Sequence, residues 1–545
     1  MAEDTPDAQV GNDDSDDEAL RLAIAMSLQE ASTASTPTPA VVAAVAPAAA
    51  SAAPAPPQSG TLLALDRKKM EEERLARLAK KRPRAQDDAV GLLPPSKKPT
   101  STPDSKSGDA ILPYPHGVVK RTWARGYPRT ADDIKIEEVL QRDQLLLALL
   151  SSYQWDEDWL LSKVDVATTK LLLVAYAADD RQKQVMRANA PPHLKFCFPP
   201  MHGPGSMHSK LQVLKFPRYL RLVVPTGNLV PYDWGETGVM ENMVFLIDLP
   251  RLQNVADHKS TPFSRSLDLF LRTMGVESKM IDSLTSYDFS KTADLGFVYT
   301  SPGGHMDESL NRVGYCGLGA AVTTLGLATT EPIEVDMAAC SASLGYLKCG
   351  FVEALYNACQ GDDGMREYGQ RPTRKADDKQ RRPRHWQQLK DRIRIYFPTN
   401  QTVSDSRGGK AAAGTICVQA RWWRSPDFPV ELMRDCVNTR EGLLMHTKVM
   451  FVRRSSVGSG RPAWAYVGSA NLSESAWGRL VKDKQSGKAK MSCRNWECGV
   501  VVPVADAATA TAADLGVFQG TVPLPMKLPG RAYGPAEEPW FFDGA

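Results

Sequence analysis

One arrangement of residues occurs twice in the chain, and this duplication limits its fold more than any other feature. The first copy reads His208-Ser-Lys210-Leu-Gln-Val-Leu. Asn228 follows the histidine by twenty residues, within Thr-Gly-Asn-Leu-Val-Pro-Tyr-Asp-Trp-Gly. The second copy keeps this order, so we expect two halves of similar fold.

The second copy reads His446-Thr-Lys448-Val-Met-Phe-Val, and Asn471 follows the histidine by twenty-five residues in Gly-Ser-Ala-Asn-Leu-Ser-Glu-Ser-Ala-Trp-Gly. In both copies a Trp-Gly pair follows, with the tryptophan six residues after the asparagine. A single His-x-Lys occurs often by chance. Two copies with one order and one offset indicate an internal duplication.

The side chains of each copy are expected to converge. A histidine and a lysine two residues apart on an extended segment point to one face, and an asparagine ending a neighbouring strand reaches the same edge. Two such halves would surround a phosphate, because lysines neutralise its charge and amides donate hydrogen bonds to its oxygens. One imidazole can attack phosphorus while the other protonates the leaving group.

The same residues argue against a metal centre. No Asp/Glu cluster has metal-ligand spacing, and paired lysines oppose a bound cation. We therefore expect no metal and no cofactor. The alternative is that the two histidines are metal ligands or hydrogen-bonded core residues.

From about Tyr114 the chain alternates short apolar runs with longer segments. The runs are continuous and rich in β-branched residues, as expected of strands buried on both faces. Leucines and a methionine at 264–274 have helical spacing. The alternation predicts an α/β body in which helices cover the sheets. The apolar runs are 145–150, 171–176, 219–224, 243–249 and 295–299.

Residues 1–110 differ in composition from this body. Ala/Pro/Ser/Thr tracts, charge blocks and few aromatics predict a disordered tail. The Ala-rich stretch at 40–57 is broken by prolines and is typical of a linker, not of a membrane span. Nine scattered cysteines without a Cys-x-x-Cys pair favour a reducing compartment. With no signal-peptide pattern at the N-terminus, we expect a soluble, intracellular protein without a membrane partner.

The tail contains an acidic cluster followed by an amphipathic segment at 16–30. Leu20, Ala23, Ile24, Ser27 and Leu28 share one helical face. The segment resembles a ubiquitin-interacting motif, in which a small alanine allows close approach and a serine supplies a polar contact. The alternative is a generic amphipathic helix that docks on the body.

Two basic segments carry a further prediction. The clusters between residues 67 and 84, Arg67-Lys68-Lys69 and Lys80-Lys81-Arg82-Pro83-Arg84, are typical of nuclear import or nucleic-acid contact. They predict a nuclear protein, and a solvated charged helix is the alternative. In the body, 361–385 is polar and basic, and we expect a mobile surface insertion that either reaches duplex DNA or is a solvated loop.

The two motifs resemble those of the phospholipase D superfamily. Most members carry an aspartate shortly after each His-x-Lys, and both copies here lack it. A later asparagine in its place is typical of one branch, the tyrosyl-DNA phosphodiesterases, which the chain resembles from about residue 110 onward. The resemblance includes Asp158-Trp159-Leu, Arg424-Ser-Pro-Asp-Phe and Leu-Pro-Gly-Arg-Ala-Tyr-Gly-Pro-Ala-Glu-Glu-Pro-Trp540.

This resemblance implies two α/β/α sandwich domains of the phospholipase D type, related by a pseudo-two-fold axis. We place them at 111–300 and 301–545 and expect a monomer. It also implies hydrolysis of the 3′-phosphotyrosyl bond that joins a topoisomerase I-derived peptide to a single-stranded or duplex DNA end. The product would be a 3′ phosphate.

The resemblance also implies residue roles. His208 is the expected nucleophile, which forms a phosphohistidine, and His446 is the expected general acid and then base. The phosphoryl oxygens would be held by Lys210, Lys448, Asn228 and Asn471.

Each imidazole also needs a partner on its other nitrogen. Glu497 matches the family's orienting glutamate. In the first half the family has a glutamine where this chain has Glu241-Asn242, and the sequence leaves open which of the two orients the second histidine.

Three further residues are candidates for DNA contact. Ser341 and Ser343, in Ala-Cys-Ser-Ala-Ser-Leu-Gly, resemble a family segment that binds DNA phosphates, and a strand-to-helix turn with a serine cap is the alternative. Tyr127 would stack on a base of single-stranded DNA, or else packs within the protein. Glu474 stands where relatives often carry a lysine, which argues against a DNA contact there.

Two other functions compete with this assignment. One is another phosphodiesterase or nuclease of the same superfamily, such as a lipid-cleaving enzyme. The other is a ubiquitin-binding adaptor with an inactive body. The absence of the aspartate from both copies opposes the first, and the complete set of reacting residue types opposes the second.

Overall fold

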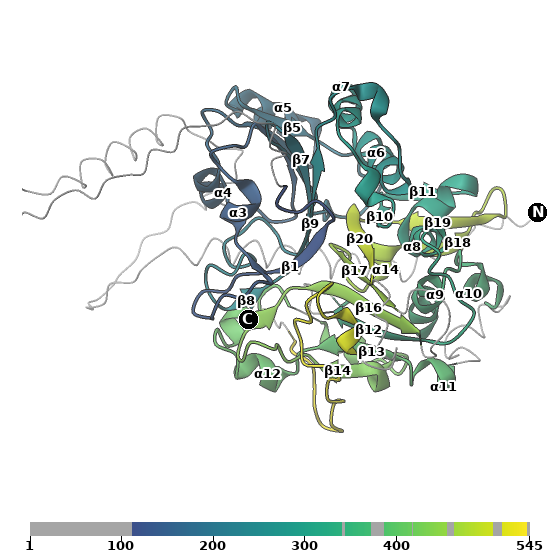
Figure 1. The fold of residues 1–545 in the computed structure, drawn as a ribbon. Helices are drawn as coiled ribbons and strands as arrows, with labels where there is room; N and C mark the ends of the chain where they lie inside the picture. The colour runs from purple at the N-terminus through teal and green to yellow at the C-terminus, as the bar shows by residue number, and fades with distance from the viewer. Residues whose placement is uncertain are drawn as a thin grey trace, which may run out of the picture.

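The computed structural model describes residues 112–339, 344–371, 386–416, 418–454, 463–504 and 515–541, which form two mixed β-sheets with helices around them (Figure 1). The predicted disordered tail lies outside the described residues. So do its ubiquitin-interacting-like helix at 16–30 and the basic clusters at 67–84. The candidate DNA contacts Ser341 and Ser343 also lie outside them.

In the described residues the first sheet has the strand order β2-β1-β9-β7-β6-β3-β4-β5. Its strands are β1 (Val118–Thr122), β2 (Asp133–Ile134), β3 (Leu147–Ser151), β4 (Lys170–Val174), β5 (Leu194–Cys197), β6 (Gln212–Lys215), β7 (Tyr219–Pro225) and β9 (Met243–Pro250).

The second sheet has the order β10-β20-β17-β16-β12-β13-β14. Its strands are β10 (Gly296–Thr300), β12 (Ile333–Ala339), β13 (Ile393–Phe397), β14 (Met433–Asp435), β16 (Lys448–Arg454), β17 (Ala463–Gly468) and β20 (Glu497–Pro503).

Apart from the edge strand β2, the two sheets match strand by strand. When strands are numbered in chain order, seven strands of each sheet stand in the same order and form the same six pairs, four antiparallel and then two parallel at the far edge. The internal duplication is thereby confirmed at the level of topology. Because β10 belongs to the second sheet, the two halves divide before Gly296 and not at the predicted position 300/301.

All five predicted apolar runs are strands, namely β3, β4, β7, β9 and β10. In β9, Phe245 and Ile247 enter a core that both halves share, whereas Val244 and Leu246 enter a second core within the first half. Successive side chains of a strand point to opposite faces. A strand between two cores therefore has no polar alternation.

The predicted helix at 264–274 is α6 (Pro262–Met274). Thr261 caps it, because its hydroxyl oxygen accepts a hydrogen bond from Ser264 N at 3.1 Å and the Ser264 hydroxyl accepts one from Thr261 N at 2.9 Å. It ends at Gly275, whose φ of 87° favours glycine. Figure 1 shows α6 on one side of the first sheet, with α3 and α4 on the other.

The remaining helices are short and lie mainly between strands (Figure 1). They are α3 (Ile136–Leu140), α4 (Glu157–Lys163), α5 (Asp180–Asn189), α7 (Ser278–Asp282), α8 (Gly314–Thr324), α9 (Cys349–Cys359), α10 (Met365–Gly369), α11 (Trp386–Leu389), α12 (Asn400–Ser404), α13 (Ala420–Trp423) and α14 (Glu474–Trp477).

Part of the predicted mobile insertion is built into the fold. Helix α10 carries the buried Glu367, which forms an ion pair with Arg371 at 2.6 Å. These residues belong to the second domain because Arg371 also donates a hydrogen bond to the backbone carbonyl of Leu480. The rest of the insertion, 372–385, lies outside the described residues.

Two small sheets complete the fold. The three-stranded one lies in the second half and consists of β11 (Gly303–His305), β18 (Arg479–Lys482) and β19 (Ala489–Cys493). The two-stranded one joins the halves, because β8 (Met240–Glu241) pairs in parallel with β15 (Leu444–Met445). Within the ranges described above, no helix has the length and apolar character needed to cross a membrane.

The central strands of the two sheets pack against each other, with β17 and β20 on β7 and β9. The asparagine of each repeated motif lies close to this junction. Asn228 lies three residues after the end of β7, and Asn471 lies three residues after the end of β17. The fold therefore brings the two motifs to one place.

Candidate active site

The first histidine is held by the opposite half of the molecule. The backbone N–H of His208 donates to the carbonyl of Trp496 at 3.1 Å. Its ring Nδ1 lies 2.8 Å from Oε2 of Glu497, the first residue of β20. The prediction that Glu497 orients an imidazole thus agrees with the contact that the structure shows.

Glu497 is itself fixed by two donors. The Ser469 hydroxyl donates to Oε2 at 2.6 Å, and the Asn495 amide donates to Oε1 at 3.0 Å. A buried carboxylate held in this way accepts a proton-bearing nitrogen, so Nδ1 of His208 is the donor in the neutral ring. Nε2 is then the nitrogen with a lone pair for attack.

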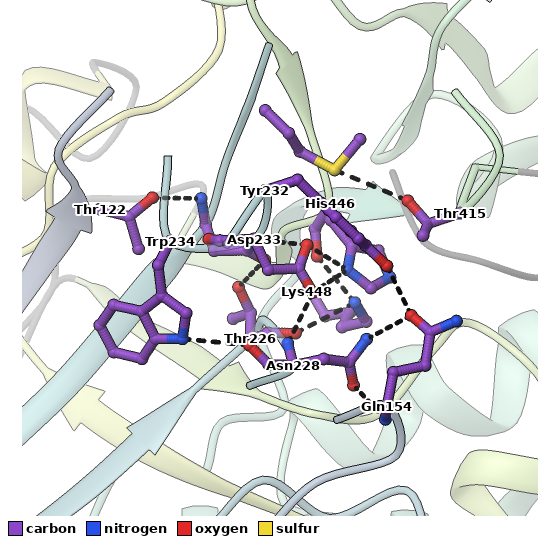
Figure 2. Close-up of polar contacts among 12 residues, drawn as sticks. Thr122, Gln154, Thr226, Asn228, Tyr232, Asp233, Trp234, Thr415, His446 and Lys448 are labelled. Atoms are coloured by element: carbon purple, nitrogen blue, oxygen red, sulfur yellow. Dashed lines mark hydrogen bonds and ion pairs between the residues drawn. The ribbon is translucent and has the colours of Figure 1, made fainter. Parts of the chain in front are cut away.

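The second histidine repeats this arrangement with a different carboxylate. The backbone N–H of His446 donates to the carbonyl of Glu241 at 3.1 Å. Its ring Nδ1 lies 3.0 and 3.1 Å from the two carboxylate oxygens of Asp233 (Figure 2). Its Nε2 is buried and has no hydrogen-bond partner among the described residues. That nitrogen is placed to exchange a proton with a substrate.

The open choice between Glu241 and Asn242 is therefore resolved by a residue that sequence reasoning missed. Neither of their side chains contacts the ring of His446 in the structure, and Asp233 does. Asn242 is the positional counterpart of Glu497, because each follows the residue whose carbonyl accepts from a site histidine. Its short amide reaches Asp233 Oδ1 instead, at 3.0 Å.

A signal for Asp233 was present in the duplication itself. The residue before the shared Trp-Gly pair is Asp233 in the first copy and Ala476 in the second. An acid in only one of two otherwise matched copies marks a role that only one copy needs. Glu241, in contrast, forms an ion pair with Arg440 at 3.2 Å, and burial raises the pKa of its carboxyl to about 7 although Arg440 opposes the rise.

The two lysines lie where the His-x-Lys spacing predicts. Nζ of Lys210 donates to the carbonyl of His208 at 2.9 Å and lies 3.3 Å from its ring Nε2. Nζ of Lys448 donates to the carbonyl of His446 at 2.7 Å and to that of Thr226 at 3.1 Å. Burial lowers the pKa of Lys210 to about 8, and the carboxylates of Glu497 and Asp233 oppose that shift.

The two asparagines differ in the hydrogen bonds that hold them. Nδ2 of Asn228 donates to Oε1 of Gln154 at 3.3 Å, and its backbone N–H donates to Asp233 at 2.6 Å (Figure 2). The indole of Trp234 donates to the Asn228 carbonyl at 3.0 Å, which explains the tryptophan of the first copy. Oδ1 of Asn471 is buried without a hydrogen-bond partner in the described part of the chain.

A glycine permits the close packing around Asn228. A Cβ on Gly227 would lie 2.7 Å from the side chain of Asn242 and 3.1 Å from Cβ of Asp233. Van der Waals repulsion excludes the first contact, and the second is tighter than most real Cβ contacts. The Thr-Gly-Asn sequence is thus required for Asp233 and Asn242 to approach this turn.

The site as a whole suits an anion. Its six motif residues are each at most 5% exposed. Burial lowers the pKa of both histidines, the two lysine charges lower them further, and the carboxylates of Glu497 and Asp233 oppose this. A phosphate group would add negative charge beside the two lysines and raise both histidine pKa values.

The remaining predicted residue, Tyr127, joins the halves. Its hydroxyl donates to the carbonyl of Glu441 at 2.7 Å, and its ring lies 5.6 Å from the Arg407 guanidinium. These contacts match the packing alternative, and the predicted base stacking stays a prediction. Tyr153 was not predicted from the sequence, and its ring centroid lies 5.2 Å from that of His208.

No group of three or more His, Cys, Asp or Glu side chains suited to a metal ion is found in the described ranges. The site residues that the structure does bring together are two imidazoles, two ammonium groups, two carboxylates and the carboxamide of Asn228. Each half supplies one imidazole, one ammonium group and one carboxylate, and each imidazole pairs with a carboxylate from the other half. The side chain of Asn471 makes no hydrogen bond to them in the described residues.

Comparisons with known proteins identify the family. The family model for tyrosyl-DNA phosphodiesterase matches residues 118–534. The Arabidopsis thaliana tyrosyl-DNA phosphodiesterase 1 is 24% identical over 527 residues, which cover 86% of this chain and 79% of the relative. The crystal structure of the yeast tyrosyl-DNA phosphodiesterase shares the fold, with a TM-score of 0.55 and 18% identity over 78% of this chain and 99% of the yeast chain. The chain belongs to the tyrosyl-DNA phosphodiesterase family.

Proposed function

We propose that this protein is a DNA-repair phosphodiesterase that hydrolyses the 3′-phosphotyrosyl bond between topoisomerase I and DNA. The observation that carries the proposal is the pair of buried histidines, one from each half, with lysines and asparagines beside them. Each histidine has a carboxylate on Nδ1. Both Nε2 atoms are therefore available for chemistry at one phosphate.

In the first step, Nε2 of His208 attacks phosphorus and the bond from phosphorus to the tyrosine oxygen breaks. Glu497 holds the Nδ1 proton and stabilises the positive charge that the ring acquires. His446 donates its Nε2 proton to the departing phenolate. A phenol has a pKa of about 10, so without that proton it leaves slowly.

In the second step, Nε2 of His446 accepts a proton from water, and the resulting hydroxide attacks the phosphohistidine. The bond from phosphorus to His208 breaks, and the DNA keeps a 3′ phosphate. Lys210, Lys448, Asn228 and Asn471 hold the phosphoryl oxygens in both transition states, where the added negative charge is greatest. All these groups are side chains, and no step requires a metal ion.

One assay tests this function against its main alternative. Release of tyrosine from a 3′-phosphotyrosyl oligonucleotide in EDTA is compared with release of choline from phosphatidylcholine. We expect turnover of the oligonucleotide alone. Choline release without tyrosine release would indicate a lipid-cleaving relative, and no release from either substrate would favour a ubiquitin-binding adaptor with an inactive body.

Nuclear import, ubiquitin binding and the topoisomerase-derived peptide are proposals that rest on the sequence. The basic clusters at 67–84 and the amphipathic segment at 16–30 support the first two. A monomer is proposed because each chain supplies both halves of the pocket.

A further inference from the structure

We propose that Asp233 is the positioning residue for the general acid, fixing the tautomer and the proton affinity of His446. This inference rests on the proposed function and deepens it. The family glutamine to which the sequence points is uncharged, whereas Asp233 is an acid. The proposal therefore concerns the charge at this position as well as the hydrogen bond.

The contacts of Asp233 make its carboxylate a fixed anion. It is fully buried, and its two oxygens lie 3.0 and 3.1 Å from Nδ1 of His446. Oδ2 also accepts from Asn228 N at 2.6 Å, and Oδ1 accepts from the Asn242 amide at 3.0 Å. Burial alone would raise the pKa of Asp233, but His446, the charge of Lys448 and the backbone N–H of Asn228 lower it below its ordinary value.

A fixed anion on Nδ1 decides which nitrogen of His446 does the chemistry. The proton on Nδ1 is held by Asp233, so the exchangeable proton belongs to Nε2, which has no partner among the described residues. The charged groups that act on His446 are Asp233, Lys448 and Lys210. Only Asp233 favours the protonated ring, so it opposes burial and both lysines.

Asp233 also links the acid to the phosphate-binding turn. One carboxylate oxygen accepts from the backbone of Asn228, whose side chain is expected to hold a phosphoryl oxygen, and both oxygens face His446. A phosphate that draws Asn228 into place therefore also sets the position of the acid. Glu497 has no such link, because its other partners are Ser469 and Asn495.

The test compares Asp233→Asn with the wild type on two single-stranded substrates, a 3′-phosphotyrosyl and a 3′-p-nitrophenyl phosphate oligonucleotide. Single-turnover rates are measured across the pH range. We expect a loss on the order of 10²-fold on the tyrosyl substrate and a much smaller loss on the p-nitrophenyl ester, whose leaving group needs no proton. The alkaline limb of the profile should move to lower pH.

The matched control is Glu236→Gln. Glu236 lies in the same loop and accepts from the Trp159 indole at 2.9 Å, without a contact to His446. We expect its rates and pH profile to equal those of the wild type. Equal losses on both substrates by Asp233→Asn, with an unmoved alkaline limb, would show a structural role only and overturn the inference.

A second measurement determines the tautomer of His446 in the wild-type protein and needs no variant of Asp233. Imidazole nitrogen NMR of the wild-type protein, with His446 assigned by its absence in His446→Asn, should show a proton on Nδ1 and none on Nε2 at neutral pH. The opposite tautomer overturns the inference. Failure of the wild type to cleave the tyrosyl substrate would refute the proposed function instead, so the two failures are distinguishable.

Discussion

The two halves of the molecule build the same seven-stranded sheet but complete their histidines differently. In the second half, the first residue of β20, Glu497, reaches across to His208 directly. In the first half the equivalent position is Asn242, and the carboxylate comes from Asp233 in the loop after β7. The proposed nucleophile is thus supported by a strand and the proposed acid by a loop.

This difference fits the two tasks. A nucleophile must stay in one place and one tautomer, and a carboxylate on a buried strand achieves this. An acid that later acts as a base must gain and lose a proton in each cycle. Its carboxylate accepts a hydrogen bond from the backbone N–H of Asn228, whose side chain is proposed to hold the phosphate, so we expect its position to respond to the substrate.

The strongest test of this asymmetry is removal of the nucleophile. His208→Ala should lower turnover by at least about 10⁴-fold and should form no covalent adduct, because the substitution removes the imidazole proposed to attack phosphorus. Denaturing gels of enzyme with a 3′-phosphotyrosyl oligonucleotide would report both. Activity close to wild type would refute the assignment of His208.

The next largest effect is expected from the other histidine. His446→Asn should slow the second step far more than the first on a p-nitrophenyl ester, because the leaving group needs no acid but the attacking water still needs a base. A protein–DNA adduct should therefore accumulate. On the tyrosyl substrate its formation should be slower. A gel without a shifted band would contradict the separate roles of the two halves.

A smaller expected effect concerns the stability of the fold and arises from Glu241 in the first half. The positional counterpart of Trp496 is Glu241, a buried carboxyl whose pKa is raised to about 7 by burial. From the ordinary carboxyl pKa up to about 7 the unfolded chain has released this proton and the folded protein still holds it, so stability falls as pH rises through that window. The cost is on the order of 3 kcal/mol at alkaline pH.

Glu241→Gln should remove this cost. We expect the variant to have a higher free energy of unfolding than the wild type at neutral and alkaline pH. The difference should be absent in acid, should grow from the ordinary carboxyl pKa to about 7, and should be constant at higher pH. Urea unfolding of the variant and the wild type at an acidic and an alkaline pH would measure it. A gain of the same size at both pH values would mean that the titration of Glu241 is not its cause.

Much of the fold and site was predictable because the same motif and the same order of strands occur twice in the chain. The apolar runs of β3, β4, β7, β9 and β10 needed no polar alternation to be recognised as buried strands. The His-x-Lys pairs share a strand face by simple periodicity, so they were predictable too. The boundary at 300/301 failed because β10 has no sequence mark that assigns it to one sheet or the other.

The partner of His446 could not be predicted, since it depends on reach and not on pattern. The family position led to Glu241 and Asn242, and the side chain of Asn242 is too short to replace a glutamine. Asp233 fills the gap from a turn that only Gly227 allows to pack so closely. The sequence indicates the position of Asn242 in the strand. The length of the Asn242 side chain decides that Asp233 makes the contact with His446.

The smallest expected effect on catalysis comes from removing residues 1–109. All the groups assigned to the reaction lie between His208 and Glu497, and the removed segment lacks the apolar content to contribute to a core. Turnover of a bare oligonucleotide by 110–545 should therefore equal that of the full chain. What should change is recruitment, and the double substitution Ala23→Arg with Ser27→Asp isolates it within the full chain.

Single-helix contacts bury little area, so affinity for one ubiquitin should be weak, on the order of 0.1–1 mM. An adduct that carries several ubiquitins would gain by avidity. The double variant should therefore lose ubiquitin binding, with oligonucleotide turnover unchanged. Ubiquitin titrated against residues 10–35 and followed by NMR measures the binding directly. Absence of shifts on its apolar face would refute this role of the tail and leave the comparison of the two catalytic halves intact, because that comparison rests on contacts among residues between His208 and Glu497.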